Sequence, residues 1–261
     1  GPPPEIHTMN PARLFHCLVF IRLTAPADAD EALLLGNIVD AETKKPVAAR
    51  IYIEDANGKW HFPESIGGSA VYYKKARPNI PDSVEMHTTL SAHPFKLVTQ
   101  PGPVTITIER GKEYFTLTNK LTLKPGENSL PFKLKRWVNM ADRGWFSGDT
   151  HVHRTLEELP DLMRAEDLNV TFPLVYWVTR AFETPTTGNK NLGGEIPKKL
   201  IKLDDTHVIY PRNTEYEIFT VNRKRHPLGA IFFLNHKSVF KVGAPPIKPV
   251  ADLARAEGAL L

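Results

Sequence analysis

The chain has 261 residues, which allows one or two domains with a sizeable apolar core. Its hydrophobic content of 41% and charged content of 24% are typical of globular proteins. The formal net charge of +4 is a small excess spread over the whole sequence, so we expect no nucleic-acid partner and interpret the basic run at 223–225 as a solvated loop.

The N-terminal region, residues 1–32, is expected to be a tail or a signal-like segment. From Met9 to Ala29 a basic residue, an apolar run and small residues follow one another, an order that loosely resembles a secretory signal. The apolar run is too short to span a bilayer, so no transmembrane segment is expected. This pattern favours an extracytoplasmic protein, periplasmic or secreted, and leaves a disordered tail on a cytoplasmic protein as the alternative.

Cysteine and proline usage limits the chemistry and the architecture. Cys17 is the single cysteine of the sequence, which therefore allows no intramolecular disulfide and no thiolate metal cluster. Any metal site must use histidine, carboxylate or water. The 23 prolines, many of them at plausible turns, favour short strands and loops over long helices in the first half of the chain.

Residues 33–137 are predicted to form a β-sandwich, because short strands bounded by Gly or Pro follow one another at even spacing. Two strands are expected within 36–55 around a polar turn, and Asn57-Gly58 is a further turn signal. The other expected strands are Pro103–Glu109, Glu113–Leu117 and Ser129–Leu134.

A long segment between these strands, residues 67–94, is expected to be a surface loop. Its aromatic and histidine side chains give it an alternative role as the lining of a ligand groove. They are Tyr72, Tyr73, His87 and His93.

The first strands of this region carry a pattern that resembles a known architecture. Gly36, Val39-Asp40, Pro46-Val47 and Ala49-Arg50-Ile51 are similar to the carboxypeptidase-regulatory-like, transthyretin-like β-sandwich. Such domains usually accompany a catalytic or surface-binding partner. The resemblance implies architecture and supplies no chemistry.

A second domain, α/β in character, is predicted for residues 138–261. Leu156–Leu168 has apolar residues at helical spacing, with Pro160 in the first turn, and Asn169–Thr179 is predicted to be a buried strand. The order strand, helix, strand predicts a parallel sheet. Ligand-binding residues of such sheets gather at the carboxyl ends of the strands.

The strand before that helix carries His151 and His153. Side chains at i and i+2 of a strand leave the same face, so both imidazoles can converge on one point. Neutral imidazole is a common ligand of zinc and similar cations, which makes a metal site the functional interpretation. The alternative is a pair of histidines that hydrogen-bond to solvent or to neighbouring groups.

The whole segment Gly144–His153 resembles the opening motif of PHP-type (polymerase and histidinol phosphatase) metallohydrolases, especially the branch related to carbaryl hydrolase. The resemblance implies a distorted β/α barrel whose metal centre hydrolyses phosphoesters, esters or amides, often after a β domain. It also implies that His151 and His153 are first-strand metal ligands. Asp149 would be a further ligand or a carboxylate that orients an imidazole; the alternative is a turn acceptor beside Gly148.

Carboxylate ligands are expected on the strand Asn213–Thr220, which carries Glu215 and Glu217 on one face. Two carboxylates that face one way repel unless a cation lies between them. By resemblance to the family segment that bears a metal-binding glutamate, Glu217 fits best and Glu215 is the second choice. A solvent-exposed face of an edge strand is the alternative.

Three other histidines are candidate metal ligands. His236 ends the apolar strand within 228–237 and is a candidate, with a hydrogen-bonded loop residue as the alternative. His207, at a strand start, and His226, in a turn beside Pro227, are weaker candidates.

The chain also departs from the family pattern. The second strand of typical members ends in an Asp-His pair, whereas this chain has Val175–Thr179 there, so we expect one ion with an open position, or binding without catalysis. Tyr176 is a possible oxyanion donor, with buried aromatic packing against Trp177 favoured. The segment 249–261 predicts a helix that ends near Gly258, and the residues after 138 are fewer than the ~200 of a complete barrel, so only its first part is expected.

The sequence therefore predicts a multidomain β plus α/β protein: a transthyretin-like β-sandwich followed by the first part of a distorted, PHP-like β/α barrel. The predicted function is a hydrolase that uses a divalent metal ion, zinc or manganese, to activate water against a small-molecule or polymer substrate. The alternative is an exported carbohydrate- or protein-binding module whose second domain is catalytically silent. The oligomeric state is left open.

Overall fold

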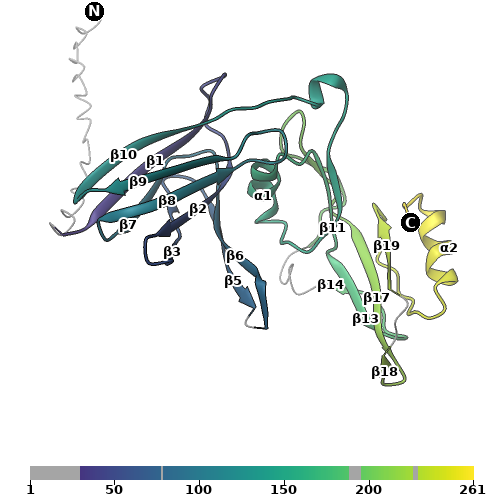
Figure 1. Cartoon of the computed structure of the whole chain (residues 1–261). Helices are drawn as coiled ribbons and strands as arrows, with labels where there is room; N and C mark the ends of the chain where they lie inside the picture. Colours follow the sequence, from purple (N-terminus) through teal and green to yellow (C-terminus); the bar gives the residue numbers. More distant parts are fainter. Residues whose placement is uncertain (1–29, 78, 188–194, 226–228) are drawn as a thin grey trace, which may run out of the picture.

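A computed structural model describes residues 30–77, 79–187, 195–225 and 229–261. The signal-like segment at 9–29, which includes Cys17, and His226 lie outside them. The chain is mostly β-sheet, with 48% of residues in strands and 9% in helices, and it forms several sheets. The first two sheets lie at one end of the molecule, helix α2 lies at the other, and α1 lies between them (Figure 1).

The first half of the chain forms two sheets. The smaller has the strand order β10 (Gly126–Leu134), β1 (Ala32–Asp40), β7 (Phe95–Thr99) and β4 (Glu64–Ser65). The larger has the order β5 (Ala70–Arg77), β6 (Ile80–Leu90), β2 (Ala49–Asp55), β8 (Gly102–Glu109) and β9 (Leu117–Leu123), with β3 (Trp60–His61) paired to β2. β1 runs parallel to β10 and antiparallel to β7.

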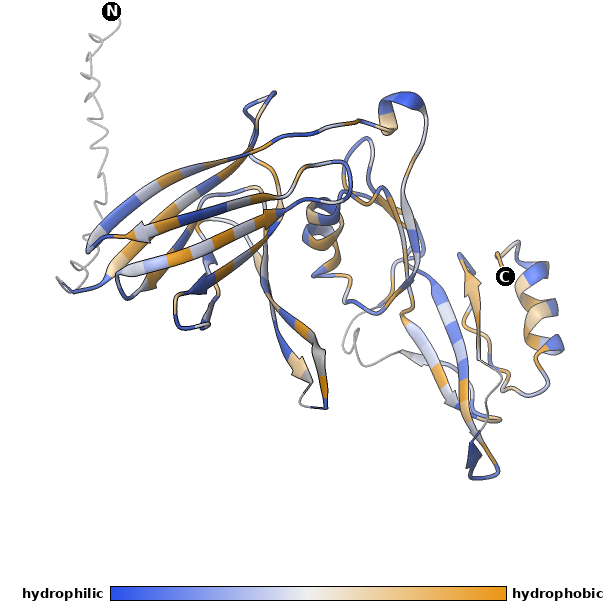
Figure 2. Cartoon of the chain, viewed as in Figure 1, coloured by the Kyte–Doolittle hydropathy of each residue, from blue (hydrophilic) through white to orange (hydrophobic). Residues whose placement is uncertain are grey.

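The two sheets enclose one apolar core. Burial alternates residue by residue along β1 and β8, as expected for strands with one face toward a core, and the same alternation is visible in Figure 2. Leu34, Phe95 and Phe132 come from the smaller sheet and meet Ile51 and Ile106 of the larger one. This core contains no residue beyond Leu134 of those that the structure describes.

Two expectations for this half are wrong. The segment Glu113–Leu117 is not a strand, because the chain turns at Gly111 and the next strand begins only at Leu117. The segment 67–94 contains the long hairpin β5–β6 instead of a loop. In β5, Ala70, Val71 and Tyr73 are half-buried, whereas Tyr72 and residues 74–76 are exposed, so the strand lacks the regular apolar alternation that would identify it.

The second half begins with the 3₁₀ turn η1 (Ala141–Arg143) and two further sheets. One has the order β11 (Gly148–Val152), β12 (Val170–Pro173), β16 (Val208–Ile209) and β15 (Ile201–Lys202). The other has β14 (Thr186–Thr187), β13 (Tyr176–Arg180), β17 (Asn213–Val221) and β18 (Lys224–Arg225), with β19 (Ala230–Leu234) also paired to β17. The helices are α1 (Leu159–Glu166) and α2 (Lys248–Ala256), whose apolar side packs against this last sheet (Figure 2).

The predicted strand, helix, strand unit is present: β11 and β12 are parallel and α1 connects them. The expected single strand Asn169–Thr179 is wrong, because it divides into β12 and β13, which belong to different sheets. The helix of the C-terminal segment is present, and after Gly258 the chain pairs with β19 through Leu260. The parallel strands of the described part of the second half belong to two separate sheets, and they form no closed barrel.

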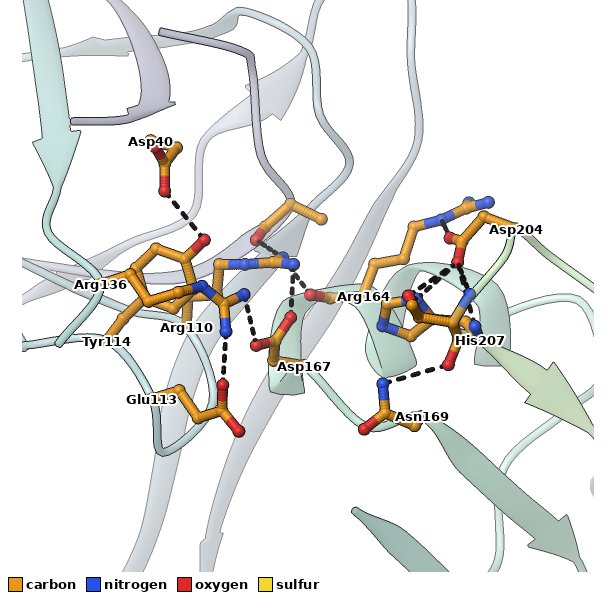
Figure 3. Close-up of polar contacts among 12 residues, drawn as sticks. Asp40, Arg110, Glu113, Tyr114, Arg136, Arg164, Asp167, Asn169, Asp204 and His207 are labelled. Atoms are coloured by element: carbon orange, nitrogen blue, oxygen red, sulfur yellow. Dashed lines mark hydrogen bonds and ion pairs between the residues drawn. The ribbon is translucent and has the colours of Figure 1, made fainter. Parts of the chain in front are cut away.

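An ion network joins the two halves of the chain (Figure 3). The carboxylate of Asp167, the residue after α1, accepts from Arg110 at 2.7 Å and from Arg136 at 2.8 Å. Both guanidinium groups also lie over the ring of Tyr114. Arg110 donates in addition to the carbonyl oxygens of Ala48 and Arg164, so one arginine contacts both halves.

A second contact between the halves surrounds His87 of β6. Its imidazole is 8% exposed and lies against the rings of Tyr52 and Tyr73, while Arg154, from the loop after β11, lies over Tyr73 at 4.5 Å. Burial and, next, the nearby charge of Arg50 lower the pKa of His87. Glu85 opposes this change and Arg154 adds to it, and the resulting pKa is about 4.

His87 is therefore expected to make the fold acid-sensitive. Its pKa of about 4 lies below the value of 6.5 in an unfolded chain, so the unfolded state binds more protons between these pH values and stability falls as the pH drops from 6.5 toward 4. The loss attributable to His87 is about 2 kcal/mol at pH 5. Urea unfolding at pH 7.5 and pH 5 measures it.

The matched variant is His87→Gln, which is expected to show a smaller loss of unfolding free energy between the two pH values than the wild type. His93→Gln, at an exposed histidine, is the control and should keep the wild-type pH dependence. Equal pH dependence in wild type and His87→Gln would contradict the prediction.

None of the helices in the described part of the chain is long and apolar enough to cross a bilayer.

Candidate metal centre

The end of β11 places two imidazoles side by side. The rings of His151 and His153 lie 5.1 Å apart between centroids, and their Nε2 atoms are 3.2 Å apart. The side chain of His151 is 53% exposed and that of His153 is 32% exposed. Both rings therefore lie at the surface end of the site, where solvent has access to them.

Glu215 supplies the third group from a different sheet. It lies on β17, between β13 and β19, and its Cα partners on those strands are Trp177 and Phe232. The side chain is fully buried. Its Oε2 lies 3.0 Å from Nε2 of His153, and its Oε1 lies 3.5 Å from Nε2 of His151.

Two aromatic residues hold the imidazoles over this carboxylate. His153 packs against Trp177 with ring centroids 5.2 Å apart, and His151 packs against Phe232 at 4.8 Å. Because the two aromatic residues flank Glu215 on neighbouring strands, each imidazole rests on one of them while its Nε2 points to the glutamate. The sequence does not identify Trp177 and Phe232, since only the strand register brings them beside Glu215.

The separations of the three groups match those of a shared ion. Ligand atoms bonded to zinc at ~2.0–2.1 Å in tetrahedral geometry lie about 3.3 Å from one another. The two imidazole nitrogens are 3.2 Å apart, and each lies 3.0–3.5 Å from a different oxygen of the Glu215 carboxylate. With one ligand atom from each residue, the three atoms lie within 4.8 Å of one another. His151, His153 and Glu215 could therefore hold a metal ion.

Electrostatics also favours a cation beside Glu215. Burial, and next the negative charge of Glu217, raise the pKa of this carboxyl to about 7. The two imidazoles are within ion-pair distance, yet neither oxygen has a hydrogen-bond partner among the described residues. This arrangement is expected of ligand atoms whose lone pairs point at a shared ion and not at one another. A buried carboxylate without hydrogen bonds is costly unless a cation compensates it.

Asp149 is not a member of this group. The strand pairing is irregular between Asp149 and Val152, and both residues line the same pocket, whereas a regular strand would put them on opposite faces. The irregularity turns Asp149 away from the face of the two histidines. Its Oδ1 accepts the backbone N–H of His151 at 2.9 Å, which is the turn-acceptor arrangement.

The structure places Glu215, and not the favoured Glu217, beside the histidines. Glu217 is paired to Ala230, two positions further along β17, and it contributes its charge to Glu215 without joining the ligand group. The strand pairing decides which glutamate is the ligand. The buried end of β17, Asn213–Tyr216, lies under the histidines, and the strand becomes exposed toward Val221.

His236 lies on the other side of β17. Its Nε2 is 2.8 Å from the hydroxyl of Thr214, whose side chain leaves the strand opposite to that of Glu215. The imidazole is buried, packs against Tyr176 and Phe240, and has its pKa lowered by burial. It therefore borders the apolar core beside α2. Tyr176 is buried in a neighbouring cluster with Val175 and Ile196, and its ring contact is with His236 instead of the expected Trp177.

His207 is held in a local turn. Its Nδ1 is 2.8 Å from Asp204, which also accepts the backbone N–H of Thr206 and of His207 (Figure 3). Burial would raise the pKa of Asp204, but these hydrogen bonds outweigh it and hold the pKa at about 2. His207 therefore stabilises the turn that precedes β16.

No family model matches the chain, and no curated protein and no solved structure is significantly similar to it. Function is therefore inferred from the geometry of the site.

Proposed function

We propose that this protein is a metal-dependent hydrolase in which His151, His153 and Glu215 bind one divalent cation, zinc or manganese. The observation that carries the proposal is that two imidazoles and a buried carboxylate, from two sheets, each place a ligand atom within 4.8 Å of the others. Two imidazole nitrogens and a carboxylate oxygen suit either metal.

Each residue has a definite part in the site. The imidazoles donate neutral nitrogen ligands, and Glu215 supplies a negative charge that its burial leaves unscreened by water. Trp177 and Phe232 fix the two rings, and Asp149 fixes the backbone of His151. The exposure of His151 leaves one side of the site open to a substrate. A bound cation would polarise the substrate and lower the pKa of a coordinated water, which is the chemistry of ester, phosphoester or amide hydrolysis.

The finer fold assignment is part of this proposal. We propose that residues 33–137 are a transthyretin-like sandwich and that residues 138–261 are the first part of a PHP-like β/α domain. Two sheets around one core support the former. The parallel β11–α1–β12 unit, with a histidine pair at the carboxyl end of β11, supports the latter.

The test is metal content followed by hydrolysis. Purified full chain incubated with zinc or manganese and then desalted is expected to retain about one ion per chain by elemental analysis. His151→Ala should abolish retention and the hydrolysis of nitrophenyl ester and phosphoester substrates. His207→Ala is the matched control, because that histidine lies in a separate turn.

Negligible metal in the wild type would overturn the proposal and favour the alternative of a binding module with a silent second domain. If the chain retains the metal but hydrolyses no ester, phosphoester or amide, the proposed metal site stands and the proposed hydrolase activity is wrong.

A further inference from the structure

A second pocket lies between the two halves of the chain, away from the metal centre. Its volume is about 180 Å³, room for about six water molecules, which suits a small organic molecule. The N-terminal half contributes residues of β2 and β6, and the second half contributes residues of β11, α1 and their connection. His151, His153 and Glu215 do not line it.

The floor of the pocket is apolar. It is formed by one side of α1 and its neighbours: Val152, Leu159, Leu162, Met163 and Leu168. Leu159 and Met163 are almost completely buried, so this floor is held in place by the core beneath it. It offers a surface for a short aliphatic side chain.

The walls carry unpaired charges of both signs. The guanidinium of Arg154 lies over Tyr73 and forms no ion pair with a described carboxylate. Glu85 and Asp149 are likewise without an ion pair in the part of the chain that the structure describes, although Asp149 accepts the N–H of His151. The other two charged residues, Arg50 and Glu166, are already paired with each other.

The same wall contains a buried polar atom without a partner. Nδ1 of His87 has no hydrogen-bond partner among the described residues, and the residue is 8% exposed. Unpartnered buried polar atoms are rare in folded proteins and indicate a group that a ligand or water satisfies. His87 remains neutral near pH 7, so its imidazole can both donate and accept a hydrogen bond.

We propose that this pocket binds a free α-amino acid with a small aliphatic side chain, such as leucine or valine. The carboxylate of the ligand would pair with Arg154 and the ammonium with Glu85 and Asp149, while the side chain would cover the apolar floor. A ligand with a single charge would leave the wall groups of one sign unpaired. A zwitterion can pair with the positive and the negative groups at the same time.

The first experiment is calorimetric titration of the full chain with L-leucine, 4-methylpentanoate and 3-methylbutylamine. The second ligand lacks the ammonium and the third lacks the carboxylate. We expect saturable binding of leucine at one site per chain and at least about tenfold weaker binding of both analogues, since each loses a charge-assisted contact. No binding of leucine or valine up to about 10 mM would overturn the proposal, and so would equal binding of all three ligands.

Variants assign the contacts. Arg154→Gln is expected to weaken leucine binding by about tenfold or more. Glu85→Gln removes a partner of the ammonium, so it should reduce the ratio between the affinities for leucine and for 4-methylpentanoate. Arg255→Gln, at an exposed arginine of α2, is the control and should bind as the wild type does. If Arg154→Gln is unfolded by circular dichroism, Arg154→Lys retains the charge and should bind leucine measurably. Unchanged affinity in a folded Arg154→Gln would contradict the site.

This proposal is independent of the hydrolase. His151→Ala, which removes a metal ligand, is expected to leave leucine affinity unchanged. A failure of metal binding and a failure of amino-acid binding are therefore separate results.

Discussion

Glu215→Gln is expected to lower the affinity for zinc or manganese by about 100-fold or more. The substitution keeps the shape of the side chain and removes its negative charge, which is the single anionic ligand of the group. Loss of an outer-shell partner alone typically costs 10–100-fold in metal affinity, so loss of a direct ligand should cost at least as much. Competition with a chromophoric chelator measures the dissociation constant.

Glu217→Gln is the matched control, since it removes the same charge two residues further along the same strand face. It should change metal affinity by only a few-fold, through the electrostatic field at Glu215. An equal loss in both variants would show that the site depends on the negative charge of the strand and not on coordination by Glu215.

The same substitution should have the opposite effect on the metal-free protein. The pKa of Glu215 is raised to about 7 from its ordinary value of 4.5, so the folded state keeps a proton that the unfolded chain has released between these values. Stability therefore falls as the pH rises from 4.5 through 7. At pH 8, Glu215→Gln is expected to raise the free energy of unfolding by about 3 kcal/mol, and at pH 5 by less than about 1 kcal/mol.

Urea unfolding in the presence of a chelator tests this sign. A residue kept only for the fold would destabilise the protein when it is replaced, at both pH values. If Glu215→Gln lowers the free energy of unfolding of the metal-free protein at pH 8, this result would contradict the role of Glu215 as an ion ligand that is retained although it lowers stability.

The local pattern was sufficient to predict the histidine pair but not the carboxylate. The i, i+2 rule puts His151 and His153 on one face because it depends only on the strand that carries them. The choice between Glu215 and Glu217 depends on which residue of β17 lies opposite Trp177 and Phe232. Register between distant strands is set by packing and has no local sequence signal.

The same limit applies to the fold. Strands bounded by Gly or Pro with one buried face, such as β8 and β10, were predictable because alternation and turn residues agree there. The hairpin β5–β6 was missed, since its polar strand is held by backbone pairing with its neighbour. Membership of a sheet was equally hidden: β12 and β13 are three residues apart in the chain and belong to different sheets.

Asp167→Asn is expected to destabilise the protein by about 3 kcal/mol. The side chain of Asp167 is 9% exposed and is paired with two arginines, one of which is itself 10% exposed. Removing the charge leaves two guanidinium groups partly buried without their shared counterion. Asparagine keeps the size of the side chain and tolerates the left-handed backbone at this position, where φ is 52°, so the loss reports the charge alone.

Thermal and urea unfolding of Asp167→Asn measure the loss, with Glu113→Gln as the matched control. Glu113 contacts Arg136 at 2.5 Å and does not contact Arg110, and its side chain is 23% exposed, so its replacement should cost less than about 1 kcal/mol. Equal losses would indicate that Arg136 alone, and not the bridge through Asp167, is the stabilising element.

The location of this network explains why its loss should be large. The apolar core of the first two sheets and the apolar clusters of the second half share no residue among those described, so polar contacts carry much of the junction between them. Asp167 directly follows α1, and Arg110 and Arg136 follow β8 and β10 (Figure 3). Without the charge of Asp167, the second half should unfold at a lower urea concentration than the first. The variant is therefore expected to show a broadened transition or two transitions, whereas the wild type is expected to unfold in one. A sharp single transition shifted to lower urea would instead show that the two halves stay coupled through the contacts of α1 with β2 and β6.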